Sequence, residues 1–440
     1  MTVKPQYGVK EEELIPVVDY PQHTRRIPTS RMFVIKKALK TYLDNGGTQT
    51  YDASQGDGGA SLPGVPAEVL ERAHELQLNK GTAYGSPAGE PEYRQAVAEI
   101  YWHLDPSLGW GPANVVAGQG GRDVLIKVFQ AMIDCGYGRV GDALLVSAVP
   151  WISYNWGPYG VGLNVLRAAG DPNCAWEIDE QALTETVKFA ESTGRKPAGL
   201  VITSPDNPTG RTMPLERQIA LAKSALAQGV RYVLFDWIYH WVSEDEPHDI
   251  NDVLREFTPE ERNQLMFLDG ITKSLGGSNI RNCHLIASEE VCNYITSRSS
   301  HGVIVSFHSQ AVAMAAYEMG FDKVAAVINE PTNASRRILK DFVADKGLQT
   351  VIGNGYYAFI NAEKWIKDSG YEDSIDFGQH LAEEYGVAVV PGAFFSQAGK
   401  YWIRFSYAQA PELAQGATER FWEGLEGLAK KGDLAQQLRR

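Results

Sequence analysis

The sequence predicts an α/β protein with a mixed, mostly parallel sheet covered by helices and a second, smaller α+β domain. Short apolar runs alternate with helical segments through the middle of the chain, which is typical of buried parallel strands joined by crossover helices. After about residue 310 a long Ala-rich helical stretch and shorter strands follow. A chain of 440 residues also exceeds the usual size of one core, so we expect two domains, which are formed from three segments of the chain. They are an N-terminal arm with part of the small domain (1–66), the large domain (67–315) and the rest of the small domain (316–440).

The predicted elements follow the chain in order. A helix is predicted at residues 66–78, after a turn-rich loop at residues 55–64. The apolar runs predicted as buried parallel strands are residues 143–148, 199–203, 232–235, 265–268 and 284–287. The helices predicted to connect them include residues 122–133, 180–192 and 215–227. The strands predicted in the smaller domain are residues 355–360, 386–390 and 402–407.

Composition and charge exclude several classes of protein. The formal net charge of -13 opposes binding to nucleic acid or to anionic membrane surfaces. No stretch approaches the roughly 20 apolar residues that span a bilayer. The cysteines show no CxxC pair and no metal-ligand spacing, so we expect no metal site and a reducing, cytoplasmic location; they are Cys135, Cys174, Cys283 and Cys292.

Lys273 and Arg281 form the first candidate for chemistry. Lys273 follows an apolar run, and Arg281 stands eight positions later behind a Gly/Ser-rich loop. A lysine amine can attach a carbonyl-bearing cofactor covalently, and a guanidinium binds phosphate well. The alternative is a surface lysine on an ordinary Gly/Ser turn.

Two further strand ends carry polar residues. Asp236 ends one apolar run, and Tyr239 follows it three residues later. A carboxylate at this place can keep a pyridinium nitrogen protonated, or it can simply cap a helix. Asn207 stands in the rigid turn Asp-Asn-Pro-Thr-Gly (206–210) after another run, where a purely structural turn is the alternative.

In this order and spacing, the three segments resemble the pyridoxal-phosphate-dependent class I/II aminotransferases of fold type I. The resemblance extends from about residue 56 to residue 408. It implies pyridoxal 5'-phosphate as cofactor, with Lys273 as its covalent attachment and catalytic base. It also implies that Asp236 holds the ring nitrogen, that Tyr239 binds the ring oxygen and that Asn207 contributes to cofactor binding. The implied reaction moves an amino group from an L-amino acid to a 2-oxo acid by a ping-pong mechanism.

The resemblance also assigns residues outside these three segments. Gly120, Gly121 and Arg122, before a predicted helix, are similar to the family's phosphate-binding turn, and Arg281 would bind the same phosphate. Trp151 resembles the aromatic that stacks on the cofactor ring. Tyr84 resembles the tyrosine that reaches the phosphate of a neighbouring subunit, which implies a homodimer.

Substrate binding is expected at three positions. Arg404 and Asn207 resemble the residues that hold the substrate α-carboxylate, and Gly56 resembles the glycine whose backbone approaches it. The loop after Gly56 lacks the aromatic-Pro run of relatives. An aromatic or large apolar substrate is suggested by the aromatic residues near the predicted site, Trp151, Tyr154, Trp156, Trp237, His240 and Trp241.

Three alternative functions remain open at this stage. Another pyridoxal-phosphate reaction on the same fold, such as that of a C–S lyase, cyclising synthase, oxidase or decarboxylase, would use the same motifs. An amino-acid sensor of this fold would need a basic DNA-binding segment, and residues before 50 show none. A nicotinamide-dependent dehydrogenase is disfavoured because residues 118–121 lack the GxGxxG spacing.

Overall fold

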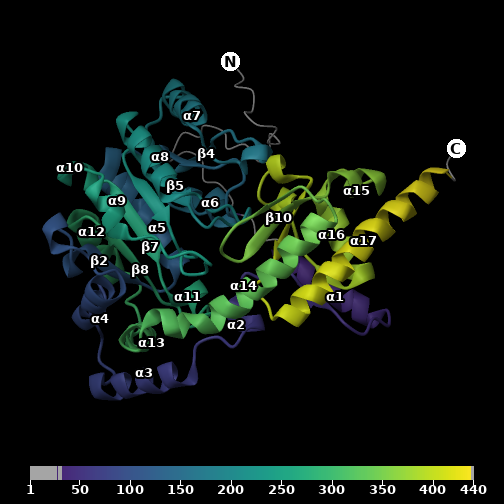
Figure 1. Ribbon diagram of the computed structural model, residues 1–440. Helices are drawn as coiled ribbons and strands as arrows, with labels where there is room; N and C mark the ends of the chain where they lie inside the picture. The colour runs from purple at the N-terminus through teal and green to yellow at the C-terminus, as the bar shows by residue number, and fades with distance from the viewer. Residues whose placement is uncertain (1–26, 28–31, 438–440) are drawn as a thin grey trace.

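The computed structural model describes residue 27 and residues 32–437, which form one large and two small sheets (Figure 1). Nearly half of the predicted N-terminal segment 1–66, namely residues 1–26 and 28–31, lies outside the described residues. The large sheet has seven strands. In spatial order they are β2 (Val115–Gly118), β8 (Cys283–Ala287), β7 (Leu265–Asp269), β6 (Val233–Asp236), β5 (Pro197–Thr203), β3 (Ala143–Val146) and β4 (Asn164–Arg167).

Six of these strands run in the same direction, and β8 runs against its neighbours β2 and β7. The predicted mixed, mostly parallel sheet is therefore confirmed, but the prediction of residues 284–287 as a parallel strand was wrong. The reason is the short return from β7: Asp269 pairs with His284, so the chain comes straight back beside the strand it has just left.

Helices cover both faces of the large sheet. Along β6, Val233 and Phe235 pack into one apolar cluster, and Leu234 packs into the cluster on the opposite face. The first face carries α3 (Ala67–Lys80), α4 (Pro91–Gln95), α7 (Glu180–Ser192), α8 (Leu215–Ala227), α9 (Ile250–Arg255) and α13 (Phe307–Glu318). The second carries α5 (Gly121–Ala131), α6 (Ile152–Trp156) and α12 (Glu289–Ser300). The remaining short helices of this region are α2 (Gly58–Ser61), α10 (Pro259–Arg262) and α11 (Ile271–Ser274).

The predicted crossover helices agree closely with the structure. Helices α7 and α8 have the predicted bounds, and α5 lies within one or two residues of its predicted segment. The strands β2 and β4 were not predicted individually, because neither contains more than two large apolar residues in a row and both lie at the edges of the sheet.

The second sheet is antiparallel, in the order β12-β13-β10-β9, and a separate parallel pair joins β1 to β11. The strands are β1 (Tyr51–Asp52), β9 (Thr350–Ile352), β10 (Tyr357–Asn361), β11 (Val387–Ala388), β12 (Val390–Pro391) and β13 (Trp402–Ser406). The single strand predicted at residues 386–390 was wrong, because the chain changes partner at Val389. The helices around these sheets are α1 (Met32–Asp44), α15 (Glu363–Asp368), α16 (Ser374–Tyr385) and α17 (Pro411–Gln437).

Helix α14 (Phe321–Asp345) connects the two regions (Figure 1). It leaves α13 beside the large sheet and packs along α17 beside the small ones. The β1–β11 pair joins the N-terminal part of the chain to its C-terminal third. The division at residues 66/67 and 315/316 stays a prediction. Within the described residues, no helix has the length and apolarity required to cross a membrane.

Arg336 of α14 makes hydrogen bonds to both regions. Its guanidinium is fully buried and donates hydrogen bonds to the carbonyls of Val242 (3.3 Å) and Gly355 (3.0 Å). It also donates to Asn333 Oδ1 (2.6 Å) and to the Tyr407 hydroxyl (3.3 Å). Arg336 thus connects the segment after β6 with the residues just before β10 through buried hydrogen bonds.

We expect Arg336→Met to lower the free energy of unfolding by about 3 kcal/mol or more, because it removes the buried hydrogen bonds of Arg336 to Val242, Gly355, Asn333 and Tyr407. The matched control is the neighbouring Arg337→Met, whose side chain is 64% exposed in its ion pair with Glu244. The control should lose less than about 1 kcal/mol. Urea unfolding of both variants checks this, and equal losses would contradict the assigned contribution of Arg336.

Candidate active site

The loops at one edge of the large sheet surround a cavity of about 520 Å³. Strands β2, β3, β5, β6 and β7 all end at this edge because they run in the same direction. Residues of strands β10 and β13 and of the loop before α2 complete the lining of the cavity. Predicted site residues in the cavity lining are Gly56, Gly121, Arg122, Trp151, Asn207, Asp236, Tyr239, Lys273, Arg281 and Arg404.

Lys273 lies in the short helix α11, directly after β7. Its amine donates a hydrogen bond to the Gly56 carbonyl. Burial lowers the pKa of the Lys273 amine from its ordinary value, and the positive charges of Arg404 and Arg122 lower it further, against Tyr357 and Asp57. A lowered pKa increases the neutral fraction of the amine, which is the nucleophilic form.

Asp236 ends β6 and is buried. The Tyr154 hydroxyl donates to its Oδ2 (2.6 Å), and the Ile238 amide donates to its Oδ1 (3.3 Å). Burial raises the pKa of Asp236 to about 6, because these two hydrogen bonds only partly stabilise the carboxylate. The site thus holds an acidic group that a neighbouring cation would stabilise in its ionised form.

Arg404 lies in β13 and is held in place from several sides. It donates to Asn207 Oδ1 and to the Ser54 carbonyl, both at 2.8 Å. Its guanidinium lies 4.2 Å from the centroid of the Tyr357 ring. The Arg404 Nε is buried without a hydrogen-bond partner among the described residues, so a donor remains for a ligand.

Gly121, Arg122 and Arg281 line the cavity together, whereas the predicted Gly120 lies beside Arg281 but is not part of the lining. The Gly120 backbone has φ +80°, and a Cβ there would lie 2.2 Å from an Arg281 guanidinium nitrogen. Arg281 donates to the carbonyls of Ser278 (2.9 Å) and Gln119 (3.3 Å). The backbone amides that begin an α-helix and a guanidinium together suit an anion.

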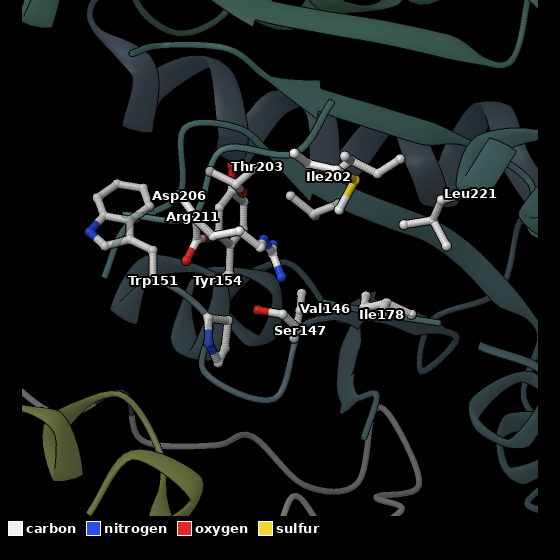
Figure 2. A pocket seen from close by; sticks show the side chains of 13 residues that line it. Val146, Ser147, Trp151, Tyr154, Ile178, Ile202, Thr203, Asp206, Arg211 and Leu221 are labelled. Atoms are coloured by element: carbon white, nitrogen blue, oxygen red, sulfur yellow. The ribbon is translucent and has the colours of Figure 1, made fainter. Parts of the chain in front are cut away.

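Trp151 precedes α6 and borders the cavity. The Arg122 guanidinium lies 5.3 Å from its ring centroid, and the Tyr154 ring contacts it edge-on at 5.7 Å. Figure 2 shows Trp151 and Tyr154 beside a second cavity of only about 10 Å³. That volume holds about one water molecule, so the larger cavity is the candidate active site.

Some predicted residues lie elsewhere. Tyr84 is 96% exposed and does not line the cavity of its own chain. Most of the aromatic residues considered for substrate binding also lie outside the lining. Trp237, His240 and Trp241 pack with Tyr101 in a buried cluster, and Trp156 packs near Tyr159. The suggestion of an aromatic substrate therefore loses most of its basis.

Two residues in contact with the site were not predicted for these contacts. Tyr154 binds Asp236, and Tyr357 binds the Tyr239 hydroxyl at 3.1 Å. For Tyr154 the only signal was its position three residues after Trp151, in the same short segment after β3. No comparable signal links Tyr357 to the site.

Comparison with known proteins agrees with this geometry. An aspartate aminotransferase of Bacillus sp. (strain YM-2) is 25% identical over 359 residues, covering 81% of this chain and 87% of the relative. The aspartate/prephenate aminotransferase of Thermus thermophilus is 28% identical over 372 residues, with the same coverage. The solved Thermus thermophilus aspartate aminotransferase with maleate has a TM-score of 0.75 at 25% identity, covering 90% of this chain and 97% of that one.

An aminotransferase from Mycobacterium tuberculosis shares the fold, with a TM-score of 0.77 at 21% identity, covering 91% of this chain and 97% of that one. The sequence family described as aminotransferase class I and II matches residues 52–420. The resemblance predicted from the motifs is confirmed, and the match covers well over half of the chain. The protein is therefore a member of the class I and II aminotransferase family.

Proposed function

We propose that this chain binds pyridoxal 5'-phosphate through Lys273 and transfers an amino group from an L-amino acid to a 2-oxo acid. The supporting observation is that the Lys273 amine, the Asp236 carboxylate and the Arg404 guanidinium line one cavity of about 520 Å³. A nucleophilic amine, a group for the ring nitrogen and a group for a carboxylate are the three requirements of such a reaction. When bound, the cofactor supplies an electron sink for negative charge at the substrate α-carbon.

The residues fit both ends of the cofactor. Gly120, Gly121 and Arg122 at the start of α5, with Arg281, would hold its phosphate. Glycine is favoured at position 120 because its φ is +80°, and a side chain there would displace the Arg281 guanidinium. The remaining groups, Asp236, Tyr239, Asn207 and Trp151, would hold its ring: Asp236 at the nitrogen, Tyr239 and Asn207 at the ring oxygen, and Trp151 against one face.

Lys273 has two tasks in this proposal. Its amine would hold the cofactor, and, once an amino acid has displaced it, the free amine would take the proton from the substrate α-carbon and deliver it to the C4′ carbon of the cofactor. A tethered base of lowered pKa suits this transfer, because it is neutral in a larger fraction of molecules and already in place.

Arg404 would bind the substrate α-carboxylate. Asn207 and the Ser54 carbonyl hold two of its nitrogens, and the unpartnered Nε adds a further donor. Gly56 would let the substrate approach the backbone. Donor and acceptor would use the same site in turn, which gives ping-pong kinetics. The names of the relatives make aspartate the first amino donor to test.

We further propose a cytoplasmic homodimer in which Tyr84 completes the neighbouring site. The exposure of this phenol, 96%, is unusual for a large aromatic side chain and suits a group that contacts a second subunit. The cysteines, all free in the structure, suit a reducing compartment.

We expect Lys273→Ala to abolish the visible absorbance band that the purified chain gives with pyridoxal phosphate, and to reduce amino transfer from aspartate by at least about a thousandfold. The exposed Lys188→Ala is the control and should keep both properties. Spectra and 2-oxo acid release measure the outcome. A band that survives Lys273→Ala would place the attachment elsewhere, and a cleaved rather than transaminated product would favour another reaction of this fold.

Asp236→Asn should separate stability from cofactor binding. Because the pKa of Asp236 is raised to about 6 in the folded chain, ionising it destabilises the cofactor-free protein as the pH rises from about 4 to about 6. The variant without cofactor should therefore melt at least as high as wild type at neutral pH. Its cofactor affinity should fall at least about tenfold. The wild-type affinity should decrease below about pH 6, whereas that of the variant should not. Titration followed by fluorescence and thermal melting test both parts; unchanged affinity would exclude Asp236 from cofactor binding.

The neighbour's contribution can be tested by mixing inactive subunits. A Tyr84→Ala chain and a Lys273→Ala chain should each be weakly active or inactive alone. Co-expressed, they should recover up to roughly half of the wild-type activity in the mixed dimer, because one of its two sites then has both residues intact. No recovery in an isolated mixed dimer would show that Tyr84 does not act across a subunit boundary.

A further inference from the structure

Tyr357 in β10 is a buried phenol at the centre of the cavity wall. Its side chain is 2% exposed, and its hydroxyl lies 3.1 Å from the Tyr239 hydroxyl. A Cβ on Gly56 would lie 2.1 Å from the Tyr357 oxygen, so this oxygen also borders the backbone that accepts from Lys273. The Tyr357 hydroxyl thus lies among three residues of the proposed site.

The ring of Tyr357 has a separate neighbour. Phe359 pairs with Arg404, and Tyr357 lies two residues before Phe359 on the same face of β10. The Arg404 guanidinium consequently lies 4.2 Å from the Tyr357 ring centroid. A cation over a phenol ring is attracted to it and draws electron density from it, which makes the hydroxyl a better hydrogen-bond donor.

Two hydroxyls at 3.1 Å share one hydrogen bond, and only one of them donates. If Tyr239 donated to Tyr357, its proton would not be available to a ligand. We propose that Tyr357 is a positioning residue: it donates to the Tyr239 oxygen and leaves the Tyr239 proton for the ring oxygen of the cofactor. The inference rests on the proposed function, because it concerns how Tyr239 meets that cofactor.

Other charged and titratable groups face this pair of phenols. Arg404 and Tyr356 interact electrostatically with Tyr239, and Arg122 does so as well. The Lys273 amine interacts in the same way with Tyr357, Asp57, Arg404 and Arg122. Burial raises the pKa of Tyr239 well above its ordinary value, so the phenol stays protonated at neutral pH and remains a donor. The titration that reports on the pair is therefore that of the linkage between Lys273 and the cofactor.

Tyr357→Phe removes the hydroxyl and keeps the ring under Arg404. A weaker hydrogen bond from Tyr239 leaves more negative charge on the ring oxygen, which holds the proton on the neighbouring linkage nitrogen more tightly. We expect the pKa of the linkage, read from visible absorbance against pH, to rise by on the order of half a pH unit. The KM for the amino acid should change less than about twofold, whereas Tyr357→Leu, which also removes the ring, should raise it about tenfold.

The double variant Tyr239→Phe/Tyr357→Phe tests whether Tyr357 acts through Tyr239. Its linkage pKa should equal that of Tyr239→Phe alone. The control is Tyr407→Phe, which loses a buried hydroxyl bonded to the Gly353 carbonyl (3.1 Å), and it should leave the linkage pKa unchanged.

An unshifted linkage pKa in Tyr357→Phe, or an additional full shift in the double variant, would overturn the proposal. If Tyr357→Phe does not fold, 3-fluorotyrosine at position 357 keeps the ring and strengthens the donor. It should then lower the linkage pKa, and a rise or no change would equally overturn the proposal. Absence of the visible band in wild type would instead reject the proposed function, so the two failures are distinguishable.

Discussion

The common direction of five strands is the constraint on which the site depends. Strands β2, β3, β5, β6 and β7 are buried on both faces, and they end at the same edge of the sheet. The ends of these strands and the segments that follow them carry Gly121, Trp151, Asn207, Asp236 and Lys273. Residues separated by more than a hundred positions in sequence therefore meet in one cavity because of strand direction alone.

The charged groups in this cavity favour ligands of particular charge. Asp236 and Arg404 are buried with fewer partners than a charged group requires, and burial lowers the pKa of the Lys273 amine. Such burial is unfavourable until a ligand supplies the missing charges. A cationic ring nitrogen beside Asp236 and a carboxylate beside Arg404 would do so, with little rearrangement of the protein. The site is thus preorganised for ligands with a defined distribution of charge.

Sequence alone predicted the fold class, the covered sheet and many of the residues that line the cavity, because these depend on local patterns: apolar runs, turn residues and motifs of fixed spacing. It could not predict contacts set by tertiary packing. Tyr154 and Asp236 are 82 residues apart, and Tyr357 and Tyr239 are 118 apart, so no local pattern relates them. The predictions of a parallel strand at residues 284–287 and of a single strand at residues 386–390 were wrong for the same reason. An apolar run shows that a strand is buried, but pairing direction depends on the path of the chain.

The cavity is shared between two sheets that the chain builds separately. Lys273 and Asp236 follow strands of the seven-stranded sheet, whereas Arg404 and Tyr357 belong to the four-stranded one. Apart from the Asn207–Arg404 and Tyr239–Tyr357 contacts, the groups that would move protons and the groups that would recognise the substrate therefore have different scaffolds. Substitutions in β10 and β13 at positions other than Tyr357 and Arg404 could then change the fit of the substrate while the reactive groups keep their scaffold. In evolutionary terms, such a division lets a family diversify its substrates on a conserved reaction.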